Sequence, residues 1–199
     1  FFIMFGAMRA IANEQMVAQV LKYLEGIVNP IAPSDTWLWV KNIWATDSPF
    51  TSVAPTLTDI SAIPRDIWQK MFEQLTPDQL ALIAQNIPNY VEGIIDFSEA
   101  NYKTTVTMLT EALQKMPAYV ATLDTVPGWS NINFLIINIS LFQNYNGLLI
   151  LPILAGVTQV LSLKLNPQQA GVEQPAQQGK QGAGMNNFMK YFFPILSIY

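Results

Sequence analysis

The chain has 199 residues, enough for one large domain or two small ones. It contains neither cysteine nor histidine, which excludes disulfide frameworks, Cys/His zinc sites, thiol nucleophiles and catalysis by imidazole. Charged residues make up only 12%, the net charge is −4 and the mean hydropathy is +0.25. This balance argues against direct binding of nucleic acid and favours a chain that is partly lipid-facing and partly exposed to water.

The first segment, residues 1–12, is apolar and is predicted to be the end of a truncated transmembrane helix. It opens Phe1-Phe2-Ile3-Met4-Phe5 without a basic n-region, so it is not a signal peptide. Residues 1–25 contain no proline and Gly26 follows, which predicts one helix that continues past the membrane surface. Because residues 189–199 are apolar too, we expect an internal piece of a longer membrane protein.

Residues 13–131 are predicted to form a mostly helical segment outside the cytoplasm. Helices are expected where proline or a capping residue precedes apolar side chains at helical spacing, over 64–75, 76–87, 88–97 and 101–115. Asp96 and Glu99, three residues apart, would share a helix face. We interpret them as an exposed acidic face and not as a catalytic pair.

Three tryptophans, Trp37, Trp39 and Trp44, lie close together in the same outer segment. Tryptophan prefers the headgroup layer of a bilayer, where the ring is sheltered and the indole N–H stays wet. We therefore predict that they are interfacial anchors. The alternative is that the three rings form the core of the outer domain.

The longest stretch without a charged residue runs from Thr125 to Leu163. Its most apolar part, residues 148–165, would rise about 27 Å as a helix, close to the roughly 30 Å hydrocarbon core of a bilayer. This predicts a transmembrane helix over 147–165, preceded by an interfacial segment over 132–146. A buried helix of a large soluble core is the alternative.

The distribution of lysine and arginine predicts the orientation. Residues 10–131 contain 13 acidic and 6 basic residues, whereas 164–190 contain three basic residues and one acidic residue. Lys164 and Lys190 each border an apolar run, as basic residues do on the cytoplasmic side. Residues 166–188, rich in Gln, Gly and Pro, are thus predicted to be a flexible cytoplasmic loop, and 189–199 the start of a truncated transmembrane helix.

Four segments of the chain resemble YidC/Oxa-type membrane protein insertases. Leu149-Ile150-Leu151-Pro152-Ile153-Leu154-Ala155-Gly156-Val157-Thr158-Gln159 is similar to the family's LPILxGVT span, and Trp39-Val40-Lys41-Asn42-Ile43 resembles the stretch after its preceding span. Phe1-Phe2-Ile3-Met4-Phe5-Gly6 and Met189-Lys190-Tyr191-Phe192-Phe193-Pro194-Ile195 are similar to the end and the beginning of two further spans. The resemblance covers residues 1–12, 37–50, 132–165 and 186–199. Residues 51–126 have no counterpart in the compact members of this family.

The resemblance implies an all-α polytopic membrane protein fragment with transmembrane helices and an extracytoplasmic helical insertion, in the cell (plasma) membrane. Such a protein is not an enzyme and needs no metal or cofactor. It guides client transmembrane segments into the bilayer through a hydrophilic groove, alone or with the Sec translocon. The implied partners are client membrane proteins, the lipid bilayer, the translocon and the ribosome.

The residues of this chain expected to line the groove and contact clients are Thr158, Gln159 and Ser162. Their alternative role is to hydrogen-bond neighbouring helices. The family's basic groove residue lies outside the sequence. Two other functions remain open: a transporter or permease fragment, which would carry ionisable residues at mid-membrane, and a soluble all-α binding module with an apolar pocket.

Overall fold

A computed structural model describes residues 2–88, 90–91, 93–130, 132–134 and 137–165. The described chain is mostly helical, as expected, with seven α-helices, one short 3-10 helix and one pair of very short strands. It divides into two compact units, Phe1–Gly147 and Leu148–Tyr199. Each unit is described by itself.

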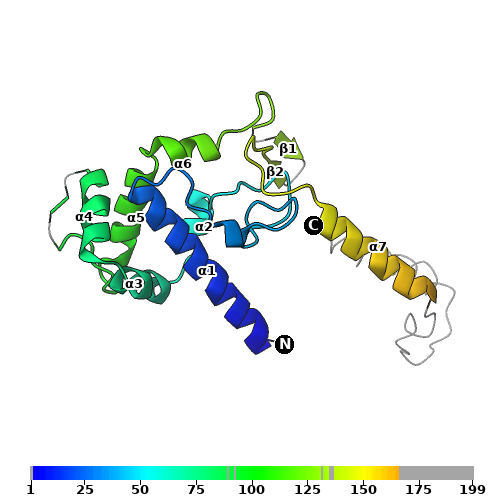
Figure 1. Ribbon diagram of the computed structural model, residues 1–199, viewed down its shortest axis with the longest axis horizontal. Coiled ribbons are helices and arrows are strands. Elements are labelled where there is room, and N and C mark those ends of the chain that lie inside the picture. The colour runs from blue at the N-terminus through cyan, green and yellow to red at the C-terminus, as the bar shows by residue number, and fades with distance from the viewer. Residues whose placement is uncertain (1, 89, 92, 131, 135–136, 166–199) are drawn as a thin grey trace. The chain divides into compact units, whose positions relative to one another are not determined.

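Among the described residues, six α-helices belong to the first unit and one to the second (Figure 1). The elements in chain order are α1 (Phe2–Leu24), η1 (Pro33–Asp35), α2 (Leu57–Ser61), α3 (Arg65–Glu73), α4 (Pro77–Asn86), α5 (Tyr102–Leu113), α6 (Pro117–Thr122), β1 (Ile132–Phe134), β2 (Ile137–Ile139) and α7 (Ile150–Leu165). The strands pair antiparallel, with Ile132 opposite Ile139 and Phe134 opposite Ile137.

Helix α1 is the central element of the first unit. Its second half packs against α3, α4 and α5, and its buried side chains supply much of the core, among them Val17, Val20, Leu21 and Leu24. It ends as predicted at Gly26, which has φ +88°. The amides of Gly26 and Ile27 donate to the carbonyls of Tyr23 and Lys22, the hydrogen bonds that close a helix at a left-handed residue.

Helices α3, α4 and α5 pack against α1, and each begins where the sequence predicts. Thr76 caps α4: its hydroxyl accepts from the amide of Gln79, and the Gln79 side chain accepts from the amide of Thr76. The predicted helices 64–75 and 101–115 are observed as α3 and α5. The core is completed by Trp68, which stacks on Phe97 at 6.1 Å between ring centroids.

Two expectations for the outer segment are wrong, and some short elements were not expected. The predicted helix over 88–97 is not formed in the described residues, because Gly93 has φ +82° and Asp96 folds the chain into a turn by accepting from Ser98 and Asn101. Asp96 and Glu99 therefore share no helix face. Helices α2 and α6 were not expected, since each has six residues or fewer and carries little periodicity. The strands within 132–146 were not expected either.

Within the described residues, no helix combines the length and apolarity needed to cross a membrane. The helix expected over 147–165 is observed as α7, which has 16 residues. The spanning character that we expected for it is therefore not found in the described part of the chain. The predicted loop 166–188 and the predicted helix start 189–199 lie outside the described residues.

Candidate functional site

The three predicted groove residues share one side of α7. At about 100° per residue, Thr158, Gln159 and Ser162 fall within about 100° of one another around the helix axis. All three are exposed. The Thr158 hydroxyl donates to the carbonyl of Ala155 at 2.8 Å, so it bonds to the backbone of its own helix. The exposed side chains of Leu151 and Leu165 fall on the same side at this spacing, so this side of α7 mixes polar and apolar side chains.

A strip of α7 that adjoins Thr158 is apolar and exposed. Ile153, Leu154, Val157 and Leu161 project there, each with roughly half of its surface accessible to solvent. Helical geometry places these four side chains within about 100° of one another. An exposed apolar strip of this length is unusual on a water-soluble surface and marks contact with protein or lipid.

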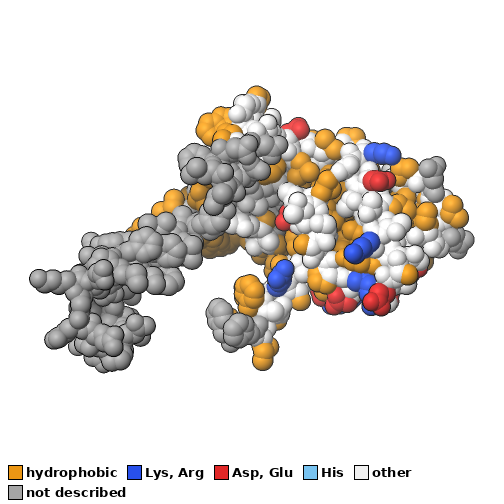
Figure 2. Space-filling model, turned by 180° about the vertical axis from the view of Figure 1, so that it is seen from behind, with side chains coloured by type: hydrophobic (Ala, Val, Ile, Leu, Met, Phe, Trp, Pro, Cys, Tyr) orange, Lys and Arg blue, Asp and Glu red, His pale blue; other side chains and the backbone are white. Residues whose placement is uncertain are grey.

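The first half of α1 is a second exposed apolar surface. The large side chains of Ile3, Met4, Phe5, Met8 and Ile11 are all exposed, Ile3 to 91%. This half projects from the helical unit (Figure 1), and apolar side chains cover its projecting end (Figure 2). One uninterrupted helix therefore runs from an exposed apolar end into the core of the first unit.

The three predicted anchor tryptophans lie on a loop and not in the core. A tight turn pairs Trp37 with Val40 and exposes Leu38 to 73%, with φ +51°, and Trp37 to 52%. Trp39 and Trp44 are half-buried. Their indole N–H groups donate to Asp47 Oδ2 at 3.1 Å and to Asp35 Oδ1 at 3.2 Å. The alternative that the three rings form the core of the outer domain is therefore wrong, since none of them belongs to the hydrophobic core of the first unit.

Two buried asparagines join this loop to the segment before α7. Asn146 is fully buried, and its Nδ2 donates to the carbonyls of Asn42, Ala45 and Thr46, at 2.8 to 3.0 Å. Its Oδ1 accepts from the amide of Asn42 at 2.7 Å. We call this pair the asparagine clasp. It connects residues 104 positions apart with every polar atom of the Asn146 side chain in use.

The clasp is also tied to the central helix. Asn42 Nδ2 donates to the carbonyl of Val53 at 2.8 Å and to Gln19 Oε1 at 3.2 Å, and Asn42 Oδ1 accepts from the amide of Trp44. Gln19 belongs to α1 and is only 3% exposed. The polar network therefore fixes the loop over residues 37–44, which we call the tryptophan loop, against the helix that carries the exposed apolar end.

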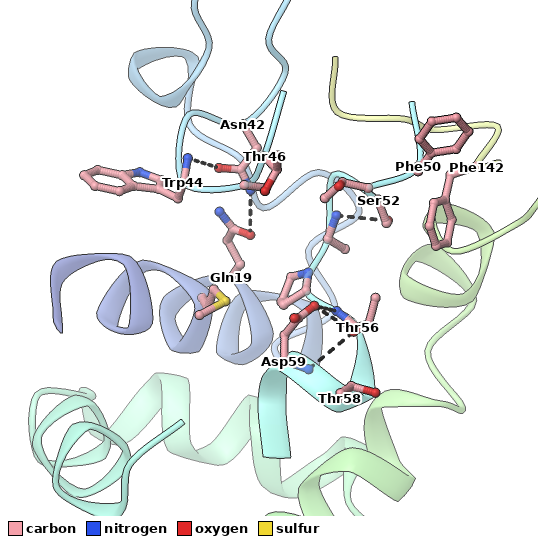
Figure 3. A pocket seen from close by; sticks show the side chains of 15 residues that line it. Gln19, Asn42, Trp44, Thr46, Phe50, Ser52, Thr56, Thr58, Asp59 and Phe142 are labelled. Carbon is pink, nitrogen blue, oxygen red and sulfur yellow. Dashed lines mark hydrogen bonds between the residues drawn. The ribbon is translucent and has the colours of Figure 1, made fainter. Parts of the chain in front are cut away.

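A cavity of about 420 Å³ opens beside this network (Figure 3). Its lining residues come from α1, the tryptophan loop, the start of α2 and Phe142, and Asp59 is the only ionisable one. Gln19 Nε2 lies at its wall, buried and without a hydrogen-bond partner. The cavity therefore offers one carboxylate and several aromatic side chains, whereas Gln19 Nε2 is closed off from solvent.

Burial controls the ionisation of the tyrosines in the first unit. Desolvation raises the pKa of Tyr119, and nearby Asp59 and Tyr23 raise it further. Its hydroxyl donates to the carbonyl of Pro55 at 2.9 Å. Desolvation also raises the pKa of Tyr23 and of Tyr102. Among the described residues, no group of three or more acidic side chains is placed to hold a metal ion.

Sequence reasoning identified none of Gln19, Asn42 and Asn146 as a key residue. Asn42 lies within the Trp39–Ile43 motif, and that position in a motif is the sequence signal that could have identified it. The burial of Gln19 and Asn146 depends on partners far along the chain, which no local pattern reveals.

Comparisons with known proteins add no further identification: no family model, no curated protein and no solved structure matches the chain.

Proposed function

We propose that the chain is part of a YidC/Oxa-type membrane protein insertase, a multi-pass protein of the cell membrane. The observation that carries this proposal is the arrangement of α7. The helix with the LPILxGVT-like sequence has Thr158, Gln159 and Ser162 on one side, where Leu151 and Leu165 are exposed too, and an adjoining strip that is wholly apolar and exposed. A helix that borders a wet groove on one side and lipid or a client on the other needs both surfaces.

Helix α1 supports the membrane location. Its exposed apolar half would be costly in water, because burying each large apolar side chain is worth about 1.5–3 kcal/mol. Placed in hydrocarbon, this half requires no partner protein. Arg9, which is exposed, would then extend its side chain toward the headgroups.

The asparagine clasp supports the resemblance. The quoted Trp39–Ile43 motif and the segment before α7 are far apart in the sequence, yet the clasp holds them together. The two ends of the segment 51–126 lie near the same stretch of chain, because Ser52 pairs with Tyr145 and Thr125 pairs with Phe142. Residues 51–126 thus begin and end near each other, as an insertion would, and their helices α3, α4 and α5 pack on the second half of α1.

An insertase of this kind needs no covalent chemistry. A polar segment of the client enters the hydrated groove, which shortens the path on which its polar groups lack water, while the apolar client helix passes into the bilayer. Each unsatisfied polar group in hydrocarbon costs several kcal/mol. Clients, the Sec translocon and the ribosome are the partners that this mechanism implies.

Two other functions compete with this one. A transporter fragment would require ionisable residues within the apolar helix, and the sequence from Ile150 to Leu163 has none. A soluble all-α binding module is favoured by the cavity but does not account for the apolar surfaces of α1 and α7.

Alkaline extraction and cysteine labelling test the membrane proposal. The chain contains no cysteine, so Asp78→Cys and Gln181→Cys each introduce a single thiol. We expect the chain to remain with membranes after carbonate washing, with a membrane-impermeant maleimide labelling intact cells at position 78 and not at position 181. Release by carbonate, or labelling at 181, would overturn the proposal or its orientation.

Photo-cross-linking tests the insertase function itself. A benzophenone side chain at position 158 or 162, in the chain joined to further core spans of an Oxa-type insertase, should cross-link to nascent membrane proteins. The same group at Leu82, an exposed position on α4, is the control. Equal client cross-linking at all three positions would contradict a groove along α7.

A further inference from the structure

The asparagine clasp contains the single Asn-Gly pair of the sequence, Asn146-Gly147. Asparagine followed by glycine is the dipeptide most prone to spontaneous deamidation, in which the amide nitrogen of the glycine attacks the asparagine side chain. Glycine favours this reaction because it has no Cβ to shield its nitrogen and adopts backbone conformations that other residues avoid. The pair is therefore a candidate site at which the chain modifies itself.

The fold requires both residues of this pair. A Cβ atom at Gly147 would lie 1.9 Å from Asp47 Oδ1, so only glycine fits there. The Asn146 side chain donates to three backbone carbonyls and accepts from the amide of Asn42, and a side-chain amide is the group that does both. The labile pair thus occupies a position where the native structure needs an asparagine followed by a glycine.

The native structure blocks the reaction of this pair. Asn146 is fully buried, and its three donated hydrogen bonds and one accepted hydrogen bond hold the side chain in place. Gly147 is buried too, and its N–H donates to the carbonyl of Ser48 at 3.3 Å. A buried, hydrogen-bonded amide loses its proton only when the structure around it opens. Deamidation is therefore confined to chains in which the clasp has opened.

In an open chain, water supplies every reactant that the pair itself lacks. Hydroxide removes the proton from the nitrogen of Gly147, and this nitrogen forms a bond to Cγ of Asn146. The bond from Cγ to Nδ2 breaks, and the leaving nitrogen takes up a proton from water and departs as ammonia. Water then opens the resulting five-membered imide at either of its carbonyls. The products are aspartate or isoaspartate at position 146.

Neither product re-forms the clasp. An aspartate carboxylate has no N–H for the three carbonyls and brings a negative charge among them, which is unfavourable in a buried site. Isoaspartate lengthens the main chain by one atom directly before Gly147, where the backbone packs closely against Asp47. We propose that Asn146-Gly147 is a self-modification site: chains in which the clasp opens deamidate there and then fail to regain the native fold. This inference does not depend on the insertase proposal.

Mass spectrometry of the full chain tests the protection. The chain is incubated in mildly alkaline buffer with and without denaturing guanidinium chloride, and digests report the conversion at position 146. We expect conversion in denaturant and a rate at least about a hundredfold lower in native buffer, which corresponds to about 2.8 kcal/mol of opening free energy. Asn144, which is exposed and precedes Tyr145, is the internal control and should convert much more slowly than Asn146 in denaturant.

Two variants separate the opening from the chemistry. Asn42→Ala keeps the reacting pair but removes the bonds from the Asn42 side chain to Val53 and Gln19 (Figure 3), and should accelerate deamidation in native buffer at least about tenfold. Asn144→Ala is the matched control and should not. Gly147→Ala should nearly stop the conversion in denaturant, where its own folding plays no part. If Asn42→Ala fails to fold, denaturant below the unfolding midpoint should accelerate the reaction of the unaltered chain instead.

Asn146→Asp tests the consequence, because it encodes one of the two products. Its denaturation midpoint should be far below that of Asn144→Asp, which makes the same charge change at an exposed position. Three outcomes would each overturn the proposal. They are equal rates at position 146 in native buffer and in denaturant, equal conversion of Asn144 and Asn146 in denaturant, and equal midpoints for the two aspartate variants.

Discussion

At Gly147 the backbone passes so close to Asp47 that no side chain fits. A Cβ atom built there would lie 1.9 Å from Asp47 Oδ1 and 2.9 Å from its backbone Cα. Gly147→Ala should therefore force the backbone apart at a cost of about 1–3 kcal/mol in the free energy of unfolding. Urea denaturation followed by tryptophan fluorescence measures the loss. Gly6→Ala, a helical position with open space around it, should leave stability unchanged or slightly raised.

The neighbouring residue Asn146 makes the strongest residue-level prediction. Asn146→Ala leaves the carbonyls of Asn42, Ala45 and Thr46 without their donor, and each unpaired buried group costs about 1–3 kcal/mol. We expect a large drop in the urea midpoint and a change in the fluorescence of the tryptophan loop. Asn144→Ala removes one exposed 3.3 Å hydrogen bond and should have little effect. Similar losses in the two variants would mean that the clasp is not a stabilising centre.

At the scale of elements, the turn that replaces the expected helix over 88–97 depends on Asp96. Hydrogen bonds from Asn101 and then from Ser98 hold the pKa of this carboxyl below its usual range. A lowered native pKa stabilises the fold above the ordinary aspartate pKa, and this contribution is lost as pH falls through the native value. NMR titration should report the low pKa, and Asn101→Ala should raise it toward the ordinary value. An unchanged titration in that variant would contradict the assignment.

The elements also differ in how they obtain stability. Helices α2 and α4 begin at reciprocal capping boxes, Thr56 with Asp59 and Thr76 with Gln79. Helix α1 depends on burial along its second half. Its ion pair between Glu14 and Lys70, at 2.6 Å on the surface, adds little, since exposed pairs are typically worth about 0–1 kcal/mol.

For the first unit as a whole, buried tyrosines predict sensitivity to alkali. The pKa values of Tyr23, Tyr102 and Tyr119 are raised above 10.0, chiefly by desolvation. Groups with a raised native pKa stabilise the fold fully below the unfolded value, and this stability is lost as pH rises above it. Denaturation midpoints should fall between about pH 9 and about pH 11. In Tyr119→Phe, which loses the bond to Pro55, we expect lower stability at neutral pH and a shallower alkaline decline. An equally steep decline would assign the effect to other groups.

Local features of this protein were predictable from its sequence because they depend on neighbours a few positions away. The stop of α1 at Gly26, the cap at Thr76 and the helices α3 and α5 belong to this group. So does the order of apolar and polar positions along α7, which follows from helical periodicity alone.

What only the tertiary structure decided involves partners distant in the chain. The burial of Asn146 requires a loop 104 residues earlier, and the free donor of Gln19 exists because Asn42 is already oriented by Trp44 and Val53. The segment 88–97, expected to be a helix, also has distant partners, since the Phe97 ring packs against Trp68 and Phe72 of α3. Side-chain hydrogen bonds to the backbone compete with the backbone hydrogen bonds of a helix. The packing of the whole unit then determines which set of hydrogen bonds forms.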